Sequence, residues 1–325
     1  MLTTVLWVIV KAVVLALLLI SGAAGLLLGE RKVLGYFQMR LGPTRVGPWG
    51  MLQPIADVVK MLLKEDIVPR DADKLVFRVA PIIAFATALA GFAVIPWGPG
   101  DGWAMSNPNS GVLVFLALGS LSVYGVALGG WASQSKYSLL GSMRATAQMI
   151  SYELAMGMAL IGIILMSGTI RLGDIVAGQA HLYNIIPQIL GFCVYFTAAL
   201  AETSRTPFDL PEAEAELVGG YNTEYAGMRW GLFFLGELVH LIVQSSLIAL
   251  LYLGGWNRIF FLQFIPPTIA FLLKVVFLLF VFIWIRATLP RMRYDRLMDF
   301  GWKVMLPLSA LNLVGTAVYV ALWAH

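Results

Sequence analysis

Residues 12–29 read AVVLALLLISGAAGLLLG and contain no charged side chain. A helix needs about 20 mainly apolar residues to cross the hydrocarbon core of a bilayer, so this stretch predicts a membrane-spanning helix. Similar charge-free intervals follow along the rest of the chain. They cover residues 79–100, 102–135, 154–170, 175–201, 238–257 and 304–325, with a further pair, 259–273 and 275–285, separated only by Lys274.

The composition supports the same interpretation for the whole chain. Of the 325 residues, 59% are hydrophobic and 12% are charged, whereas soluble domains average about 45–50% apolar and about 25% charged residues. Soluble enzyme folds are excluded because too few polar side chains exist to cover a soluble globule. We predict an all-α polytopic membrane protein with one transmembrane domain over residues 1–325. Eight spans are expected near residues 5–28, 79–97, 111–132, 146–168, 183–202, 229–254, 267–287 and 301–323.

The Lys and Arg residues predict the orientation of these spans. The segments after the first, third, fifth and seventh spans hold nine, two, two and five of them, which is 18 of the 22 in the chain. Cytoplasmic loops of membrane proteins are enriched in Lys and Arg. We therefore expect residues 29–78, 203–228 and 286–300 to be cytoplasmic. Both termini are then periplasmic, and the membrane is the inner membrane of a bacterium. Residues 21–24 resemble a signal-peptide cleavage site, but we expect the first span to be retained because its removal would break this alternation.

Side chains that hold redox groups are almost missing. The chain has one cysteine, Cys193, whereas an iron–sulfur cluster needs four thiolates, or two thiolates with two histidines. Of three histidines only His240 lies deep in an apolar segment, so a haem held by two histidines is not expected. The sequence also lacks the Gly-rich motifs that bind nucleotides. We expect this chain to bind no cofactor of its own, and its basic excess reflects membrane topology rather than nucleic-acid binding.

A loop of about 50 residues separates the first two spans, which is long for a simple connection. Apolar residues recur in it at helical spacing, and polar residues occupy the opposite face. The apolar set is Ile55, Val58, Val59, Leu62 and Leu63, and the polar set is Gln53, Asp57, Lys60 and Lys64. This pattern predicts an amphipathic helix lying in the headgroup plane. Two roles stay open for it: an anchoring linker, or a wall over a cavity that opens at the membrane surface.

Residues 202–224 concentrate acidic side chains. They include Glu202, Asp209, Glu212, Glu214, Glu216 and Glu224, with Arg205 as the only basic residue. Carboxylates that lie close together and are partly buried have raised pKa values. Because apolar residues interrupt the acidic ones, the loop has surface to bury against the bundle. It is either a solvated acidic loop or a segment whose carboxylates pass protons or sense a ligand.

Ionisable residues also lie deep inside expected spans, notably Glu153, Glu237, His240 and Lys274. A charge at the centre of a membrane helix costs at least about 2.5–3.5 kcal/mol, so such residues are functional candidates. Glu237 and His240 are three residues apart and share one helix face. The structural alternative, which stays open, is that each residue locks helices together.

Four stretches together resemble the membrane H subunit (chain 1 in mitochondria) of NADH:quinone oxidoreductase, respiratory complex I. They are GERKVLGYFQMRLGPTRVG from Gly29, GMLQPIADVVKMLLKED from Gly50, TSRTPFDLPEAEAELVGGYNTEYAG from Thr203 and IRATLPRMRYDRLM from Ile285, in the order usual in that family. The resemblance covers essentially the whole chain. Thr44 and Trp230 stand where the family usually has Asn and Phe, and neither departure touches a charged position.

The resemblance implies a function in a proton-pumping enzyme complex. In that family the H subunit joins the electron-transfer arm to the membrane arm and forms much of the tunnel through which quinone reaches an iron–sulfur cluster of a neighbouring subunit. Quinone would be the substrate, while NADH, flavin and iron–sulfur clusters would be bound by partner subunits, so the chain is not catalytic alone. Its partners would be the hydrophilic quinone-site subunits, small membrane subunits of the pumping arm, and membrane lipid.

The matching motifs assign these roles to residues. Near the quinone tunnel the resemblance implies Glu30, Arg31, Gln38, Arg40, Asp57 and Arg286, with the amphipathic helix at the mouth. In a carboxylate chain that links quinone reduction to proton translocation it implies Glu153, Glu202, Asp209, Glu212, Glu214, Glu216, Glu224 and Glu237.

Two other functions share some of these features. A stand-alone proton or sodium transporter would also carry intramembrane Glu and Lys residues, but the sequence shows no inverted repeat of the kind common in such folds. The homologous subunit of a membrane-bound hydrogenase-type complex shares the fold without necessarily binding quinone. The first basic motif and the helix around Asp57 favour the quinone-binding branch.

Overall fold

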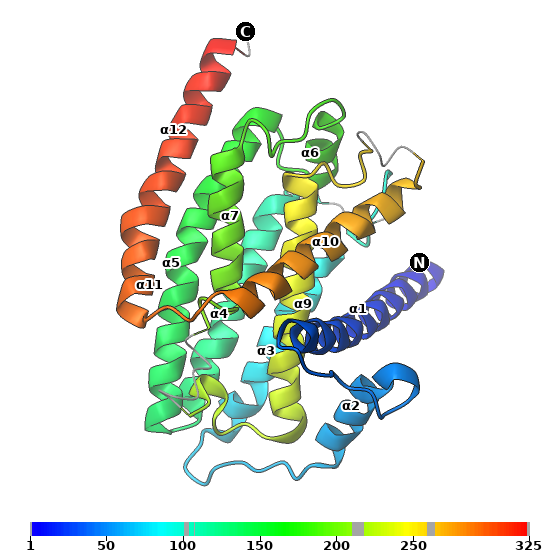
Figure 1. Ribbon diagram of the computed structural model, residues 1–325, viewed down its shortest axis with the longest axis vertical. Helices are drawn as coiled ribbons and strands as arrows, with labels where there is room; N and C mark the ends of the chain where they lie inside the picture. Colours follow the sequence, from blue (N-terminus) through cyan, green and yellow to red (C-terminus); the bar gives the residue numbers. More distant parts are fainter. Residues whose placement is uncertain (1, 101–103, 107, 210–217, 259–263, 324–325) are drawn as a thin grey trace.

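The computed structural model describes residues 2–100, 104–106, 108–209, 218–258 and 264–323. Within these residues it consists of helices joined by turns and loops, without a strand, which confirms the predicted all-α class (Figure 1). In chain order the elements are α1 (Leu2–Phe37), η1 (Pro48–Gly50), α2 (Gln53–Leu63), α3 (Lys74–Ala93), α4 (Gly111–Ala132), α5 (Lys136–Ser167), α6 (Leu172–Gly178), α7 (Ile189–Glu202), η3 (Gly220–Asn222), α9 (Gly227–Leu251), α10 (Pro267–Thr288), α11 (Tyr294–Phe300), η5 (Gly301–Met305) and α12 (Leu306–Trp323).

Seven helices in the described part of the chain are long and apolar enough to cross a membrane. They cover Ile9–Phe37, Lys74–Ala93, Gly111–Ala132, Lys136–Ser167, Gly227–Leu251, Pro267–Thr288 and Tyr294–Leu322. The remaining expected span, 183–202, corresponds to the shorter apolar helix α7, which begins only at Ile189. Pro187 accounts for the late start because a proline disfavours helical geometry at the residue before it. The protein is thus a polytopic membrane protein, as predicted.

Several helices extend beyond their expected cytoplasmic ends. α1 continues to Phe37 instead of ending near residue 28, and α5 begins at Lys136 instead of near residue 146. The last helix begins at Tyr294, where α11, the π-helical turn η5 and α12 follow one another without a break. Hydropathy locates the apolar middle of a helix, whereas the polar turns beyond it are equally good helix formers. Charged residues expected in loops therefore lie on rigid helical turns.

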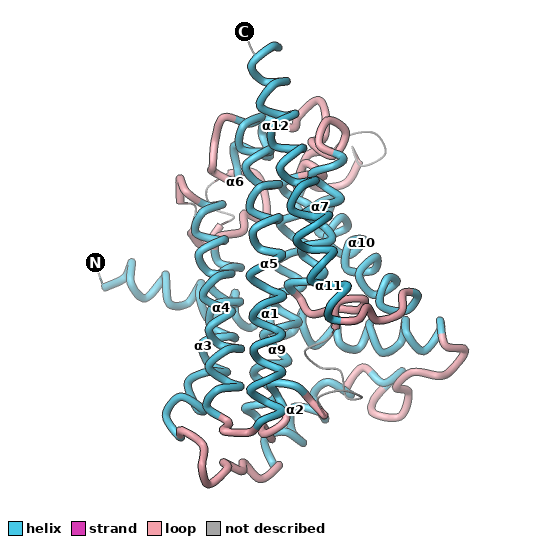
Figure 2. The backbone as a smooth tube through the Cα atoms, turned by 90° about the vertical axis from the view of Figure 1, so that its left-hand side faces the viewer, coloured by secondary structure: helices cyan, strands magenta, loops and turns pink. Residues whose placement is uncertain are grey.

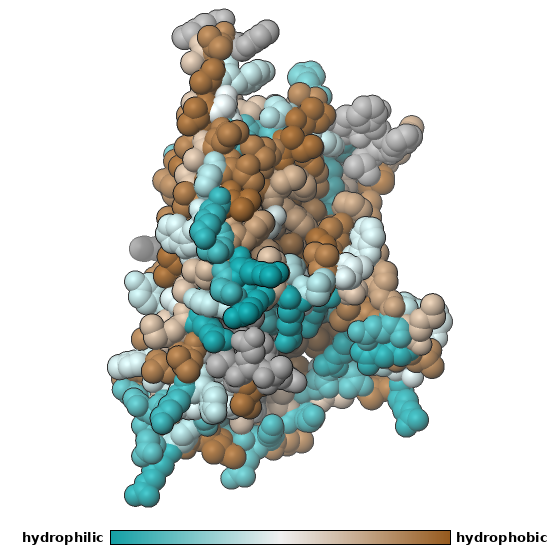
Figure 3. Space-filling model, turned by 60° about the vertical axis from the view of Figure 1, so that its left-hand side comes forward, coloured by the Kyte–Doolittle hydropathy of each residue, from teal (hydrophilic) through white to brown (hydrophobic). Residues whose placement is uncertain are grey.

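α9 is the central helix of the bundle. In its most apolar 18-residue window 78% of the residues are buried, compared with 11% in the window of Ile9–Phe37. Figures 1 and 2 show α1 crossing the bundle at a steep angle, while α12 lies at the outer edge and extends past its neighbours. In Figure 3 hydrophobic side chains cover most of the upper half of the visible face, and hydrophilic side chains gather in the lower half. The bundle therefore has one strongly polar end.

The amphipathic helix predicted near residues 53–64 is present as α2. Its apolar side chains, from Ile55 to Leu63, are exposed, and Met61 lies against Gly231 at the start of α9. Exposed apolar side chains favour the predicted position of this helix at the membrane surface. The tight turn before α2 requires glycine at Gly50, where φ is +76° and an added Cβ would lie 2.2 Å from the Pro43 carbonyl oxygen.

Lys274 of α10 has a structural role, which was one of the two alternatives left open for it. Its ammonium group donates hydrogen bonds to the carbonyl oxygens of Leu253, Gly255 and Asn257 at 2.7, 2.8 and 2.8 Å. It also lies over the ring of Tyr183, 4.6 Å from the centroid. Carbonyl groups beyond a helix C-terminus need donors, and a positive charge there is favourable. Lys274 thus ties α10 to the end of α9.

Candidate functional site

The first cluster of charges surrounds Glu30 on α1. Its carboxylate is buried and accepts hydrogen bonds from Arg205, at 2.6 Å, and from Arg286 at the end of α10. α1 reaches this point only because it remains helical past the expected end of the span. Two guanidinium groups on one carboxylate leave one net positive charge in a poorly hydrated place, which attracts an anion or a group that becomes negative.

Arg205 and Asp209 extend this cluster along the segment that follows α7. Both side chains are buried, and within the described residues Arg205 Nε and Nη2 and Asp209 Oδ1 have no hydrogen-bond partner. Arg291 donates to Asp209 Oδ2 at 2.9 Å. Burial raises the pKa of the Asp209 carboxyl, although Arg291, Arg286 and Arg205 act in the opposite direction. A small cavity of about 20 Å³ is lined by Arg205, Asp209, Arg286 and also Glu237.

The other residues expected near a quinone lie at the junction of α1 and α2. Arg31 donates to Asp57 at 2.5 Å, and Gln53 donates to the other oxygen of Asp57 at 3.0 Å. Arg40, in the turn after α1, donates to Gln38 at 2.6 Å. The contact between Arg31 and Asp57 fastens α2 to α1, and it is more exposed than the contact between Glu30 and Arg205. The resemblance places six residues near one quinone tunnel. In the structure they lie in two clusters, one around Glu30 and one where α1 meets α2.

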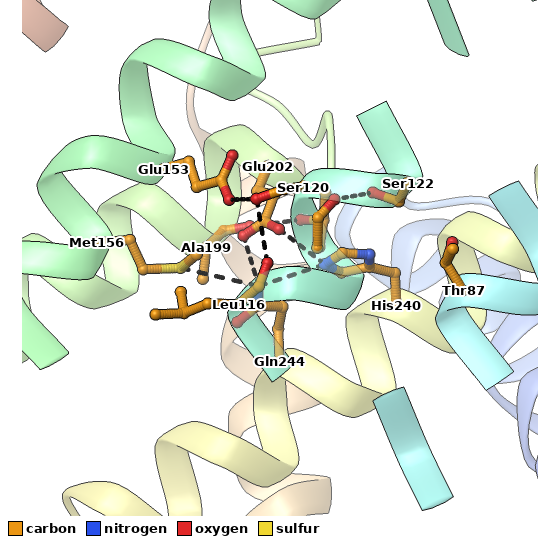
Figure 4. Close-up of polar contacts among 12 residues, drawn as sticks. Thr87, Leu116, Ser120, Ser122, Glu153, Met156, Ala199, Glu202, His240 and Gln244 are labelled. Carbon is orange, nitrogen blue, oxygen red and sulfur yellow. Dashed lines mark hydrogen bonds and ion pairs between the residues drawn. The ribbon is translucent and has the colours of Figure 1, made fainter. Parts of the chain in front are cut away.

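A second buried cluster forms where α7 meets α9, around Glu202. Gln244 donates to Glu202 Oε2 at 2.6 Å, and His240 Nε2 lies 3.3 Å from Glu202 Oε1. Figure 4 shows Glu202, His240 and Gln244 together. The Tyr195 hydroxyl donates to Gln244 Oε1 at 3.0 Å, which fixes the amide. Glu202 is therefore held by neutral donors and one imidazole. Within the described residues no Lys or Arg forms an ion pair with it, and its one ion-pair partner is His240.

Glu153 on α5 lies beside this second cluster (Figure 4). It accepts a hydrogen bond from Ser120 of α4. The neighbouring Gly119 allows Glu202 to approach the same helix, since an added Cβ would lie 3.2 Å from Glu202 Oε1. The adjacent residues Gly119 and Ser120 thus each lie against one of the two carboxylates.

Glu237 on α9 lies between the two clusters. It accepts a hydrogen bond from the Tyr221 hydroxyl at 2.7 Å. Besides the cavity that it shares with Arg205 and Asp209, it lines a second cavity of about 40 Å³ together with Glu202 and His240. Either cavity is large enough for at least one water molecule. Glu237 therefore borders a cavity of each cluster.

The remaining expected carboxylates have different outcomes. Glu224 is half-buried in the segment before α9, and within the described residues no contact joins it to either cluster. Three others, Glu212, Glu214 and Glu216, lie outside the described residues. Of the acids expected in proton coupling, the described structure thus gives contacts or shared cavities to Glu153, Glu202, Asp209 and Glu237.

Sequence reasoning missed the neutral partners of these acids, chiefly Tyr221, Gln244 and Ser120. One signal was available for Gln244, because Glu237, His240 and Gln244 follow at intervals of three and four residues and so lie on one helix face. Ser120 and Tyr221 reach their acids from other elements, and the sequence carries no comparable signal for them.

Comparison with known proteins gives a consistent assignment. The chain is 60% identical over 323 residues to the NADH-quinone oxidoreductase H subunit numbered 1 of Symbiobacterium thermophilum, a match that covers 99% of this chain and 98% of the relative. It is 51% identical over 327 residues to the NADH-quinone oxidoreductase H subunit of Syntrophotalea carbinolica, with 98% of both chains covered. Residues 10–317 match the family described as NADH dehydrogenase. The chain belongs to the NADH dehydrogenase family.

Proposed function

We propose that this chain is the H subunit of a proton-pumping NADH:quinone oxidoreductase in a bacterial inner membrane. It provides the path of quinone from the membrane to a partner subunit that carries the iron–sulfur cluster. Through its buried carboxylates it couples quinone reduction to proton translocation by neighbouring membrane subunits. The observation that carries the proposal is the series of acids from Glu30 to Glu153, linked by hydrogen bonds, cavities and one helix turn.

An apolar groove supports the path for the quinone tail. It has a volume of about 790 Å³ and lies between α1 and α10, lined almost wholly by aliphatic and aromatic side chains. Its lining reaches Gly29 and Val33, on either side of Glu30, and Ile283, one turn before Arg286. An isoprenoid tail fits an apolar groove, and the polar headgroup would then lie toward the positively charged cluster. α2 lies at the membrane boundary beside α1, where the resemblance places the mouth.

The proposed coupling between quinone reduction and proton translocation is electrostatic. Quinone reduction creates negative charge and consumes protons, and in a poorly hydrated place this shifts the pKa values of neighbouring acids. The negative charge on the quinone would interact first with the positively charged cluster around Glu30. The arginine residues of this cluster also act to lower the pKa of Asp209, so the two are electrostatically linked. Glu237 then connects this cluster to Glu202, and Gly119–Ser120 connects Glu202 to Glu153.

The proposal is tested in the assembled complex in sealed vesicles. Glu237→Gln and Glu153→Gln each keep the shape of the side chain but remove the titrating group. We expect both variants to lower proton translocation and coupled NADH:quinone turnover by roughly tenfold or more. Asp174→Asn, which changes an exposed acid at the start of α6, serves as the matched control and should leave both rates unchanged.

Wild-type quinone reduction and wild-type proton translocation in both Glu variants would refute the carboxylate chain. A transport rate shown by the purified chain alone, without the other subunits, would favour a stand-alone transporter. Assembly with hydrogenase-type partners and no effect of added quinone would favour the hydrogenase-type complex.

A further inference from the structure

Among the intramembrane residues singled out from the sequence, His240 has a role neither in joining helices, as Lys274 has, nor in the proposed function. It lies on α9 one turn after Glu237 and faces Glu202. In Figure 4 its ring points toward Glu202 and Gln244, with Thr87 on its other side. The imidazole thus lies beside Glu202, and Glu237 lies one turn earlier on the same face of α9.

The neighbours of the His240 ring offer Nε2 a hydrogen-bond partner whether or not this atom carries a proton, and the ring need not move. Nε2 lies 3.3 Å from Glu202 Oε1 and 3.2 Å from Gln244 Nε2. Gln244 already donates one amide hydrogen to Glu202 Oε2 at 2.6 Å, and its second hydrogen can point to an unprotonated Nε2. When Nε2 carries a proton, that proton can point to Glu202 instead. Nε2 can therefore gain or lose a proton while the ring keeps a partner.

The second half of the connection is the cavity of about 40 Å³ that the His240 ring lines. His240, Glu202 and Glu237 all line it, together with polar side chains that can hold water. Three of these are Ser122, Ser204 and Tyr221. A cavity of this size with several polar partners is suited to water. A smaller cavity of about 10 Å³ continues past Ser122 and Thr87 along the same ring.

We propose that His240 is the proton-relay residue between Glu237 and Glu202. A proton released by Glu237 passes through cavity water to Nδ1 of the imidazole, and the proton on Nε2 passes to the Glu202 carboxylate. One proton enters the ring as one leaves, so the ring returns to neutrality and rotation or a second water exchange restores the starting tautomer. Imidazole is the side chain that best performs this exchange near neutral pH.

The surrounding ionisable groups are consistent with a directed path. On α9, Glu237 accepts a hydrogen bond from the Tyr221 hydroxyl. On α7, Glu202 accepts one from the Gln244 amide, whose oxygen in turn accepts one from the Tyr195 hydroxyl. Glu153 follows beyond the Gly119–Ser120 segment. Within the described residues no Lys or Arg forms a salt bridge with Glu202 that would hold its charge fixed. This inference rests on the proposed function, since it specifies how two of the proposed acids communicate.

The test compares His240→Gln with His240→Phe in the assembled complex. Gln keeps a hydrogen-bonding group near Nε2 but does not titrate, whereas Phe removes both nitrogen atoms. If His240 relays protons, both variants lower kcat for coupled NADH:quinone turnover by roughly tenfold or more, with the KM for quinone unchanged. The solvent deuterium isotope effect on turnover should also increase, because proton transfer becomes slower than the other steps. NADH oxidation by an artificial acceptor that takes electrons upstream of quinone measures the amount of assembled complex.

Two further variants make the outcomes distinguishable. Ser245→Ala, a buried residue on α9 that bonds only within its own helix, should behave as wild type. Glu202→Gln should lose coupled turnover if the proposed function holds. Wild-type turnover in His240→Gln together with loss in Glu202→Gln would overturn the relay alone, and it would mean that cavity water is sufficient or that the histidine only fills space. Wild-type behaviour in Glu202→Gln as well would overturn the proposed function.

Discussion

At the scale of single residues, the most informative group is Asp209, because opposing effects act on its carboxyl. Burial raises its pKa, while three arginines favour its charged form. One oxygen is bonded to Arg291, and within the described chain the other has no partner. A carboxyl in this position changes its protonation after a small change in nearby charge. Asp209 is therefore suited to respond when quinone becomes negative near Arg205 and Arg286.

Arg291→Gln should move the acid limb of the pH profile to higher pH. Removing this guanidinium leaves the effect of burial less opposed, so the pKa of Asp209 rises further. If the ionised form of Asp209 is needed, coupled turnover then begins to fall at a higher pH as the medium is acidified. The measurement is coupled NADH:quinone turnover as a function of pH in sealed vesicles.

Arg293→Gln is the matched control for this prediction. Arg293 carries the same charge two residues away, but it pairs with Asp295 at the exposed surface. Its loss should leave the pH profile unchanged. Identical profiles for wild type and Arg291→Gln would show that Asp209 does not titrate in the rate-limiting step.

The same residues show how far the sequence predicts the site. Intramembrane position alone singled out Glu153 and Glu237, because a charge inside a membrane helix is energetically costly and is seldom present without a function. The partners of Glu30 could not be predicted in this way. Arg205 and Arg286 are 175 and 256 positions from Glu30 along the chain, and only the packing of α1 against the rest of the bundle brings them together.

At the scale of elements, the steep tilt of α1 determines where the apolar groove lies. α1 and α10 diverge over the groove while the Glu30 cluster holds them together at its polar end. Gly25 of α1 lines this groove, and an added Cβ there would meet nothing within 4 Å. A larger side chain at this position can therefore project into the groove without disturbing the helix packing.

Gly25→Leu should weaken the binding of long-tailed quinones. The leucine occupies part of the groove, and overpacking of this kind costs about 1–3 kcal/mol. We expect the KM for a quinone with a long isoprenoid tail to rise roughly fivefold or more. The KM for a short-tailed analogue should stay unchanged, because its headgroup does not need the groove.

The control for this variant is Gly315→Leu on α12. That position also has open space around an added Cβ, but it does not line the groove. An equal KM for long-tailed quinone in wild type and Gly25→Leu would exclude the groove as the tail path and would direct attention to the face between α1 and α2.

Element positions were predicted better than element ends. Apolar periodicity identified α2, and charge-free intervals identified the long helices, because both patterns reflect burial or lipid contact directly. The extension of α1 to Phe37 and the start of α5 at Lys136 were not predicted, since their polar turns look like loop by hydropathy. The extension of α1 matters because it places Glu30 and Arg31 on a helix, which orients Glu30 toward Arg205 and Arg31 toward Asp57.

At the scale of the whole molecule, the charges separate one polar end from an apolar body. The starts of α3, α5 and α9 lie at this polar end, and α10 descends from the opposite end toward the middle of the molecule (Figure 1). Its last turn carries Arg286 of the Glu30 cluster. α6 lies at the opposite end (Figure 1). Enrichment of Lys and Arg on the cytoplasmic side of membrane proteins then gives an orientation in which quinone chemistry faces the cytoplasm, where the electron-transfer arm of the proposed complex would bind.

Cysteine labelling can test this orientation with little background. The chain has a single cysteine, Cys193, so Cys193→Ser gives a cysteine-free parent to which one cysteine is added at a time. Asp71→Cys lies in the exposed segment before α3, and His181→Cys lies in the exposed segment after α6. We expect a membrane-impermeant maleimide to label Asp71→Cys only in inside-out vesicles and His181→Cys only in right-side-out vesicles. The parent measures nonspecific labelling, and detergent-opened vesicles should label both variants. The reverse pattern would place the Glu30 cluster on the periplasmic side and would exclude the proposed contact with a cytoplasmic electron-transfer arm.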